Sequence, residues 1–373
     1  MLKQARHTMI WLATAMMLMT GCQYDGVVAD IQTEDAGSDT LAISFGDGVI
    51  DALLRTKAVT LLSDHTYTMG VWGWQTSKSG KVGRLFLNQE VTFNPELGRW
   101  TYSPQKYWDA GSSYRFYAYA PHSTKAGNVT VSIDQETGFI SLAGVTLKGS
   151  NTMDTLAQPK PTGKFGSEDD IDWLIDRAGK IIPKEQIHGR VTFNLQHILA
   201  KFNVMVNTNK SFGSTGMLTL DSIVIGQFHR KADFTQQLNH TPSILEEADQ
   251  AVTEWVIDTQ SEPYSICSTK NLTVTEDDLC VIESLLVPQE ITDSQTVQIC
   301  YSIHPESGQT NRFVFTLNLN EAFGSIECSN NYTLHINLGP DIITFDAGTD
   351  VWNNEPASYE WIVTDSENLN LDY

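Results

Sequence analysis

Short runs of alternating apolar and polar residues follow one another along most of the chain. In the first run, residues 40–46 (TLAISFG), small or polar residues separate Leu41, Ile43 and Phe45. A period of two is typical of a strand with one buried face. Because turn-forming Gly and Pro divide the runs, the pattern predicts antiparallel β-sandwiches rather than an α/β sheet. Similar runs occur at residues 66–74, 84–94, 99–104, 114–121, 129–134, 139–147, 201–207, 218–228, 296–303, 312–320 and 332–339.

Helix-like patterns are scarce. The best examples are residues 170–178 (DIDWLIDRA) and 195–202 (LQHILAKF), and both are short. A short apolar run is a weak helix signal, so we expect at most two short helices there. His197, within the second segment, is expected to be a hydrogen-bonded structural group rather than a ligand.

The longest apolar run lies near the start of the chain. Residues 9–21 (MIWLATAMMLMTG) follow Lys3, Arg6 and His7, which is the layout of a secretory signal peptide. The run is too short to span a bilayer core of about 30 Å as a helix. Its end, Leu18 to Cys22, resembles the bacterial lipobox, in which the cysteine thiol is acylated. We therefore expect residues 1–21 to be a lipoprotein signal peptide and Cys22 to carry lipid; the alternative is an ordinary signal peptide with a coincidental cysteine.

The rest of the chain is long enough for two domains. Residues 22–39 are acidic and contain Gly and Ser, which predicts a flexible tether. A chain of 373 residues exceeds what one hydrophobic core usually supports. The composition changes around residues 163–175, so we expect an N-terminal domain at 40–172 and a C-terminal domain at 173–373.

Net charge and cysteine content bear on which partners and which covalent bonds the chain could have. The chain has 24 Lys and Arg against 45 Asp and Glu, a net charge of −21, which makes nucleic acid an unfavourable partner. Besides Cys22, the cysteines are Cys267, Cys280, Cys300 and Cys328. In an exported chain these four are candidates for disulfides, with three pairings open. Metal binding is the less favoured interpretation because the sequence has no Cys-x-x-Cys.

No catalytic or cofactor motif stands out. The sequence contains no His-Glu-x-x-His, Gly-x-Ser-x-Gly or phosphate-binding glycine loop, so we expect neither an enzyme nor a cofactor. The aromatic stretch at residues 114–121 could stack on sugars, but alternation along a strand places at least half of its rings in a core. We therefore predict a structural role for it.

The segment RWTYSPQKYWDAGSSYRFYAYAP, residues 99–121, resembles the fimbrillin-like family of Bacteroidetes surface proteins, the subunits of type V pili. Later segments resemble further blocks of that family, in the family's order. The first block is carried by Trp100, Tyr102, Pro104, Tyr107, Trp108, Gly111, Tyr114, Phe116, Tyr119 and Pro121; the later ones are residues 172–177, 191–206, 284–289 and 332–345.

The resemblance implies two tandem transthyretin-like antiparallel β-sandwich domains and a lipid anchor in the outer membrane. It also implies assembly by strand exchange: a trypsin-like protease removes the first strand, and a neighbouring subunit's C-terminal segment fills the groove. The family's cleavage position falls on Thr56-Lys57-Ala58, with Arg55 just before it. Arg55 and Lys57 are therefore the candidate processing residues; the alternative is that they are ordinary solvated loop charges.

The tail contains a candidate donor strand. Tyr359, Trp361 and Val363 alternate with other residues and would present three large side chains to one side of an extended segment. We expect this tail to be the donor strand or a cover on its own domain until assembly. The alternative is permanent packing on its own sheet, with residues 369–373 (LNLDY) as a disordered end.

These observations predict a structural or adhesive subunit, stalk or accessory, of a cell-surface fimbria. Its expected partners are other fimbrial subunits, a trypsin-like protease and the outer membrane. The alternatives are a fimbrial anchor, or a surface lipoprotein that does not polymerise and binds a glycan or host protein.

Overall fold

The computed structural model describes residues 42–46, 49–50, 60–61, 68–122, 129–134, 139–147, 170–176, 180–184, 190–208, 216–237, 253–261, 264–268, 272–306, 308–339, 343–351 and 361–364. At 49–50, 60–61, 139, 180–181, 216, 264–268, 351 and 361–364 this description covers the backbone only. All of these residues belong to one compact unit, Thr40–Tyr373. The signal peptide and tether expected at residues 1–39 lie outside the described residues.

Strands dominate the described residues, and the all-β prediction is confirmed. The largest sheet, here called the large sheet, has nine strands. Its order is β3 (Thr60–Leu61), β2 (Val49–Ile50), β13 (Asn194–His197), β10 (Leu174–Asp176), β7 (Ser113–Ala120), β4 (Thr68–Thr76), β5 (Val82–Asn94) and β6 (Arg99–Thr101), with β11 (Lys180–Ile182) beside β7. A short parallel pair, β1 (Ser44–Phe45) and β12 (Arg190–Val191), accompanies this sheet.

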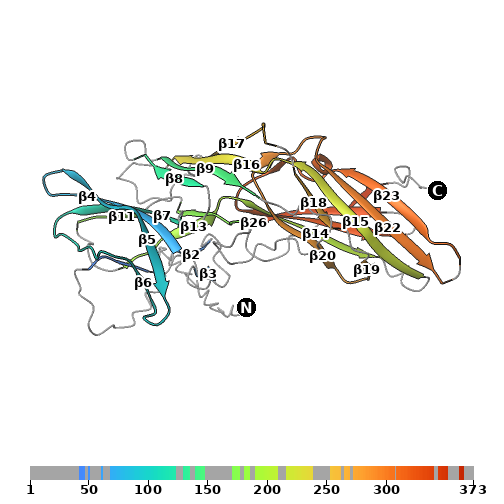
Figure 1. Ribbon diagram of the computed structural model, residues 1–373, viewed down its shortest axis with the longest axis horizontal. Coiled ribbons are helices and arrows are strands. Elements are labelled where there is room, and N and C mark those ends of the chain that lie inside the picture. The colour runs from blue at the N-terminus through green and yellow to red at the C-terminus, as the bar shows by residue number, and fades with distance from the viewer. Residues whose placement is uncertain are drawn as a thin grey trace, which may run out of the picture. The chain divides into compact units, whose positions relative to one another are not determined.

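A four-stranded sheet, the small sheet, combines segments that are far apart in the sequence. Its order is β17 (Thr253–Ile257), β16 (Lys231–Gln237), β9 (Phe139–Thr146) and β8 (Thr130–Ile133). Figure 1 shows the yellow β16 beside the green β9, and the two strands pair antiparallel from Lys231↔Thr146 to Gln237↔Phe139.

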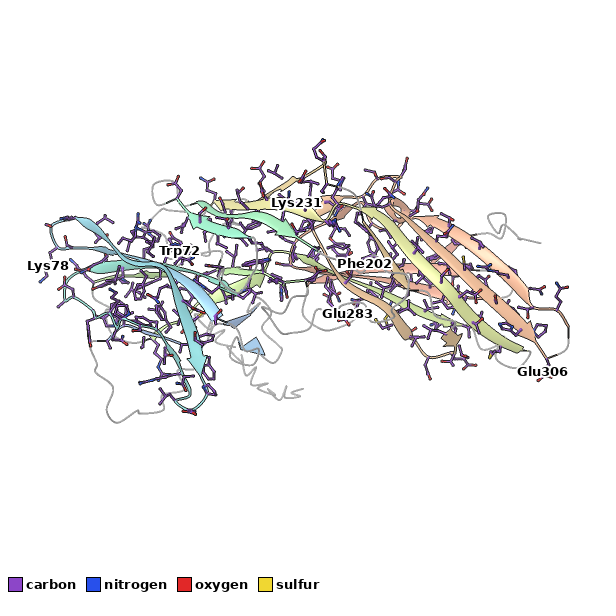
Figure 2. The ribbon with its side chains drawn as sticks, in the orientation of Figure 1. Trp72, Lys78, Phe202, Lys231, Glu283 and Glu306 are labelled. Carbon is purple, nitrogen blue, oxygen red and sulfur yellow. The ribbon has the colours of Figure 1, made fainter. Side chains whose placement is uncertain are left out.

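Two five-stranded sheets enclose the core of the C-terminal part. The tail sheet has the order β20 (Leu279–Leu286), β14 (Ala200–Thr208), β25 (Asn330–Leu338), β26 (Ile343–Val351) and β27 (Trp361–Thr364). The opposing sheet has β18 (Tyr264–Ser268), β15 (Gly216–Phe228), β22 (Thr296–Pro305) and β23 (Asn311–Asn318), with β19 (Leu272–Val274) beside β15. A short pair, β21 (Gln289–Glu290) and β24 (Ser325–Ile326), and the 3₁₀ turn η3 (Leu319–Glu321) complete the described elements. Phe202 of β14 is fully buried in this core, whereas Glu306 is exposed beyond β22 (Figure 2).

The described residues of the two helix-like segments form no helix: residues 174–176 are β10, residues 195–197 belong to β13, and residues 200–202 begin β14. Leu174, Ile175 and Leu195 are buried in the large sheet, which has apolar cores on both faces. A strand of that kind has a continuous apolar run, which a helical pattern resembles over so few residues.

Apolar cores lie on both faces of the large sheet. On β7, Tyr114 and Phe116 pack into a first core with β1, whereas Tyr117 and Tyr119 pack into a second core with the small sheet. The prediction that the aromatic stretch is structural is confirmed. Gly70 of β4 lies against one of these rings, since a Cβ there would come within 2.0 Å of Tyr119 Cε1.

The chain crosses three times between the part formed by the large and small sheets and the part formed by the tail and opposing sheets, and two of these connections are only two residues long. At Ile198-Leu199, Ile198 N–H donates to Trp173 O and Leu199 O accepts from Ser329 N–H, each over 3.0 Å. Next to this connection, His197 Nδ1 lies 2.8 Å from Asp172 Oδ2.

The second connection, His229-Arg230, is held by a buried amide. Gln289 Oε1 accepts from His229 N–H, and Gln289 Nε2 donates to His229 O, both over 3.0 Å. Strands from both sides of the expected boundary at 172/173 share sheets: β10 and β13 lie in the large sheet with β7, and β16 lies in the small sheet with β9. The division into two tandem domains stays a prediction.

Candidate strand-exchange site

The first described segment, residues 42–46, is built into the first core. Its side chains alternate as the sequence predicts: Ile43 is fully buried and Phe45 is 2% exposed, whereas Ala42 and Ser44 are half-buried. The Phe45 ring packs against four aromatic rings, with centroids 5.5 to 6.1 Å away. These rings, here called the Phe45 slot, belong to Phe86, Tyr102, Phe116 and Phe193.

Backbone hydrogen bonds hold this segment on both edges. Ile43 N–H donates to Lys106 O over 2.9 Å, and Ala42 forms an antiparallel bridge with Tyr107. On the other edge, β1 runs parallel to β12, and Gly46 N–H donates to Val191 O over 3.0 Å. The segment therefore fills a slot between residues 106–107 and 190–191, as a strand inserted between two others does.

Two side chains form a polar latch on the same segment. Tyr102 Oη donates to Ile43 O over 2.8 Å, and Gln105 Nε2 donates to the same oxygen over 2.9 Å. Gln105 Nε2 also donates to Tyr102 Oη over 2.8 Å. Burial raises the pKa of Tyr102 from 10.0 to about 12, so its hydroxyl remains a hydrogen-bond donor to a higher pH than that of an ordinary tyrosine.

The expected processing residues follow this strand along the chain. β2 pairs parallel with β13 and antiparallel with β3. Arg55 and Lys57 lie between β2 and β3, outside the described residues. A single cut at either residue would separate β1 and β2 from the rest of the chain while β3 stays attached.

The candidate donor strand is an edge strand of the tail sheet. β27 pairs antiparallel with β26, from Asp346↔Trp361 to Ile343↔Thr364. This pairing is compatible both with a cover that is released on assembly and with a permanently packed tail. Tyr359 and the side chains of Trp361 and Val363 lie outside the described part, and the donor role stays a prediction.

The cysteines whose side chains the structure describes lie in the C-terminal part of the chain. Cys300 is buried on β22, Cys280 lies on β20 in a different sheet, and Cys328 lies between β24 and β25. The side chain of Cys267 and the whole of Cys22 lie outside the described residues, so the disulfides and the lipid attachment remain predictions.

Sequence reasoning missed the polar latch. Tyr102 and Gln105 are 59 and 62 residues from Ile43 along the chain, and their partner is a backbone oxygen. Tyr102 does belong to the family block recognised in the sequence. That block indicated an aromatic strand but carried no signal that this hydroxyl bonds to the first strand.

The described part of the chain offers no other obvious kind of site. No group of three or more His, Cys, Asp or Glu within it could hold a metal ion. None of its helices is long and apolar enough to cross a membrane.

The fold, in which antiparallel sheets pack around apolar cores, defines an all-β sandwich protein. A family model described as fimbrillin-like matches residues 56–352. The chain therefore belongs to the fimbrillin-like family, as the sequence blocks indicated. This is a family of structural fimbrial proteins and not an enzyme class, and it implies a cell-surface location.

Solved structures are similar in fold. A fimbrial protein from Bacteroides vulgatus ATCC 8482 aligns with a TM-score of 0.53 and 16% identity, over 84% of this chain and 100% of that chain. A candidate cell adhesion protein from Bacteroides uniformis ATCC 8492 aligns with a TM-score of 0.47 and 13% identity, over 84% of this chain and 99% of its own. At these identities the likeness to the first structure establishes the fold alone. No curated protein sequence matches the chain.

Proposed function

We propose that this chain is a structural and adhesive subunit, stalk or accessory, of a cell-surface fimbria, assembled by protease-triggered strand exchange. The observation that carries the proposal is the position of the first strand. Ile43 and Phe45 are core residues, yet the covalent chain beyond them leads directly to the basic residues Arg55 and Lys57. Strand exchange requires a buried strand that a single cut can release, because its removal leaves a groove for another strand.

Cleavage creates an acceptor groove. Loss of residues 42–50 removes the hydrogen-bond partners of residues 106–107 and 190–191 and exposes the Phe45 slot. Burial of each large apolar side chain is worth roughly 1.5 to 3 kcal/mol, so the empty groove favours any strand that replaces Ile43 and Phe45. Unpaired strand edges with apolar slots bind an added strand readily. The tail of a neighbouring subunit supplies that strand.

The signal peptide and Cys22 account for how the precursor is held at the membrane before cleavage. Acylation of Cys22 holds the precursor on the outer membrane through residues 22–39. The cut after Arg55 or Lys57 separates the folded body from this anchor and opens its groove at the same moment. A trypsin-like protease and other fimbrial subunits are therefore its partners.

Cleavage-blocked variants test this function. The precursor with Arg55→Ala and Lys57→Ala should remain monomeric after mild trypsin treatment, whereas the wild type should lose its first strand and form polymers. Lys81→Ala is the matched control, since Lys81 is an exposed basic residue on the turn between β4 and β5. Intact-mass analysis and size-exclusion chromatography provide the readout. Equal polymerisation of the blocked variant would refute the proposal.

The pairing of β27 favours a second candidate, a surface lipoprotein that does not polymerise and binds a glycan or host protein. Trp361–Thr364 already lie on the chain's own tail sheet, as in a permanently packed tail. The two candidates differ in the mature N-terminus. A surface form that begins at Cys22 indicates an anchor or a monomeric binder, whereas one that begins after Arg55 or Lys57 indicates a polymerising subunit.

A further inference from the structure

The strand β23, Asn311–Asn318, is the outermost strand of the opposing sheet. It pairs with β22 without a break, from Ile303↔Asn311 to Thr296↔Asn318, and no described strand pairs with its other edge (Figure 1). Its sequence, NRFVFTLN, contains no proline, lysine or carboxylate. Proteins usually prevent an edge strand from pairing with other molecules by keeping it short or by adding bulges, prolines or charged side chains. Apart from Arg312, β23 has none of these devices.

The other described edges are protected in these ways. Along the outer edge of β5, one extra residue between Phe86 and Gln89 interrupts the pairing with β4. A similar bulge at Val281 interrupts the pairing of β20 with β14. The remaining described edge strands have at most five residues each. Within the described part of the chain, β23 is therefore the one long and regular edge.

The charge around β23 bears on which strand can pair with it. Residues 272–306 and 308–339 contain nine Asp and Glu but a single Lys or Arg, which is Arg312. Two copies of a chain with a net charge of −21 repel each other most strongly where carboxylates meet. Strands of one sheet lie about 4.8 Å apart, so pairing of two copies is most favourable along a strand without carboxylates. The edge of β23 meets this requirement.

A second β23 fits this edge in length and in sequence. A twofold axis perpendicular to the sheet makes the two strands antiparallel and keeps their solvent-facing residues on one face. Among these residues, Arg312 and Thr316 are exposed and Val314 is half-buried. With the axis at Val314, the valine lies opposite its own copy and Arg312 lies opposite Thr316. β-Branched residues pair well across strands, and no two charges are directly opposite each other.

The neighbouring register is less favourable. An axis at Phe315 places Val314 opposite Thr316, so the valine loses its apolar partner. The same shift places Arg312 opposite Asn318, which adds no charge pair. The register with the axis at Val314 is therefore the better one.

We propose that two copies of this chain pair side by side through β23, antiparallel about a twofold axis at Val314, so that their opposing sheets form one continuous sheet. The pairing goes beyond the proposed function, because it needs neither cleavage nor strand exchange. An interface of this symmetry joins two copies and then closes. One such contact is small and weak, but copies held in two fibres repeat it, and repetition raises the overall affinity. The contact between fibres rests on the proposed function; the pairing of two copies does not.

The precursor with Arg55→Ala and Lys57→Ala isolates this contact, because it lacks both candidate processing residues. Sedimentation equilibrium at concentrations up to about 1 mM should show a reversible monomer–dimer equilibrium. Raising the NaCl concentration from about 50 mM to about 500 mM should strengthen the dimer at least threefold, because salt screens the repulsion between two acidic copies.

Lysine substitutions locate the contact on β23. Val314→Lys should weaken the dimer at least tenfold, because it places two like charges opposite each other at the axis. Thr316→Lys, at an exposed position, places a second cation opposite Arg312 and should weaken the dimer as well. Thr273→Lys is the matched control: it adds the same charge at an exposed position of β19 in the same sheet and should leave the dimer unchanged. Urea midpoints should be equal for all three variants.

Two results would overturn the proposal. One is a precursor that stays monomeric over the whole concentration range at high salt. The other is a dimer that survives both lysine substitutions on β23, or that Thr273→Lys weakens equally. Neither result affects the proposed function, which polymerisation after trypsin treatment tests separately.

Disulfide trapping tests the register. Cys300 is opposite Val314 in the pairing of β22 with β23, so Cys300→Ser is the background that prevents a bridge within one copy. In this background Val314→Cys should form a disulfide-linked dimer under mild oxidation, because residues opposite each other on paired strands meet the geometric needs of a disulfide. Thr316→Cys is the matched control, since the two copies of residue 316 are then offset by about 13 Å along the strands. Cross-linking through position 316 instead of 314 would overturn the register, and Cys300→Ser alone reports any reaction of the other cysteines.

Discussion

Replacement of Phe45 by alanine should destabilise the precursor strongly and the processed protein not at all. Phe45 is 2% exposed and contacts four aromatic rings, so its truncation leaves a cavity that rigid neighbours cannot close. Phe→Ala changes in cores cost about 3 to 5 kcal/mol. A loss of that size is a large fraction of the roughly 5 to 15 kcal/mol by which domains are usually stable.

Urea unfolding of purified precursors at pH 7 measures this loss. Trp100 and Trp108 belong to the same core as Phe45, so tryptophan fluorescence reports its unfolding. Ser44→Ala is the matched control on the same strand, since Ser44 is half-buried and outside the apolar core; it should change the free energy of unfolding by less than about 0.5 kcal/mol.

The second half of this test follows the variant through processing. Once trypsin has cut and the first strand has been separated, the wild type and Phe45→Ala consist of the same residues and should unfold at the same urea concentration. A loss below about 1 kcal/mol in the precursor would refute the view that Phe45 completes the core. A difference that survives removal of the strand would show that the cut does not detach it.

Three further predictions concern lipid attachment at Cys22, the polar latch and the His229-Arg230 connection. Cys22→Ala should abolish palmitate incorporation and outer-membrane retention of the precursor, and unchanged labelling would exclude the lipobox. The folded-state pKa of Tyr102, about 12, exceeds the ordinary value of 10.0, so its contribution to stability is complete below pH 10 and lost as the pH rises towards 12. The urea midpoint should therefore fall less between pH 10 and pH 12 in Tyr102→Phe than in the wild type. An equal fall in both proteins would mean that other tyrosines cause the loss of stability. Gln289→Ala leaves the backbone N–H and C=O of His229 without their amide partner and should lower the free energy of unfolding by about 2 to 4 kcal/mol. Gln298→Ala, at an exposed position, is the control and should leave the urea midpoint nearly unchanged. Equal midpoints for the two variants would show that the Gln289 amide does not stabilise the His229-Arg230 connection.

The sequence indicated the first strand of the candidate site correctly but not what holds it. Alternation in residues 40–46 is a local property, and it predicted that Ile43 and Phe45 point inward. The latch from Tyr102 and Gln105 joins residues about sixty positions apart through a backbone oxygen. Neither residue type is specific for such a bond, so no pattern in the sequence marks it.

The helix-like segments show how tertiary structure can override a local pattern. Residues 174–176 and 194–197 are mostly buried because their strands, β10 and β13, belong to the large sheet, which has apolar cores on both faces. The sheet partners of β10, β13 and β16 lie in distant parts of the chain, so the composition change near 172/173 carries no information about them. Composition changes locally along the chain, whereas sheet partners are chosen by contacts between distant segments.

The sequence by itself therefore determined the strand content, the acidic character, the inward residues of the first strand and the fimbrillin-like family. These properties depend on local period, composition and short blocks of residues. Only the tertiary structure decided which strands pair, that both faces of the large sheet are covered, and that residues 42–46 lie between 106–107 and 190–191. Pairing and register depend on how whole apolar faces can be buried together, and that free energy exists only when segments far apart in the chain meet.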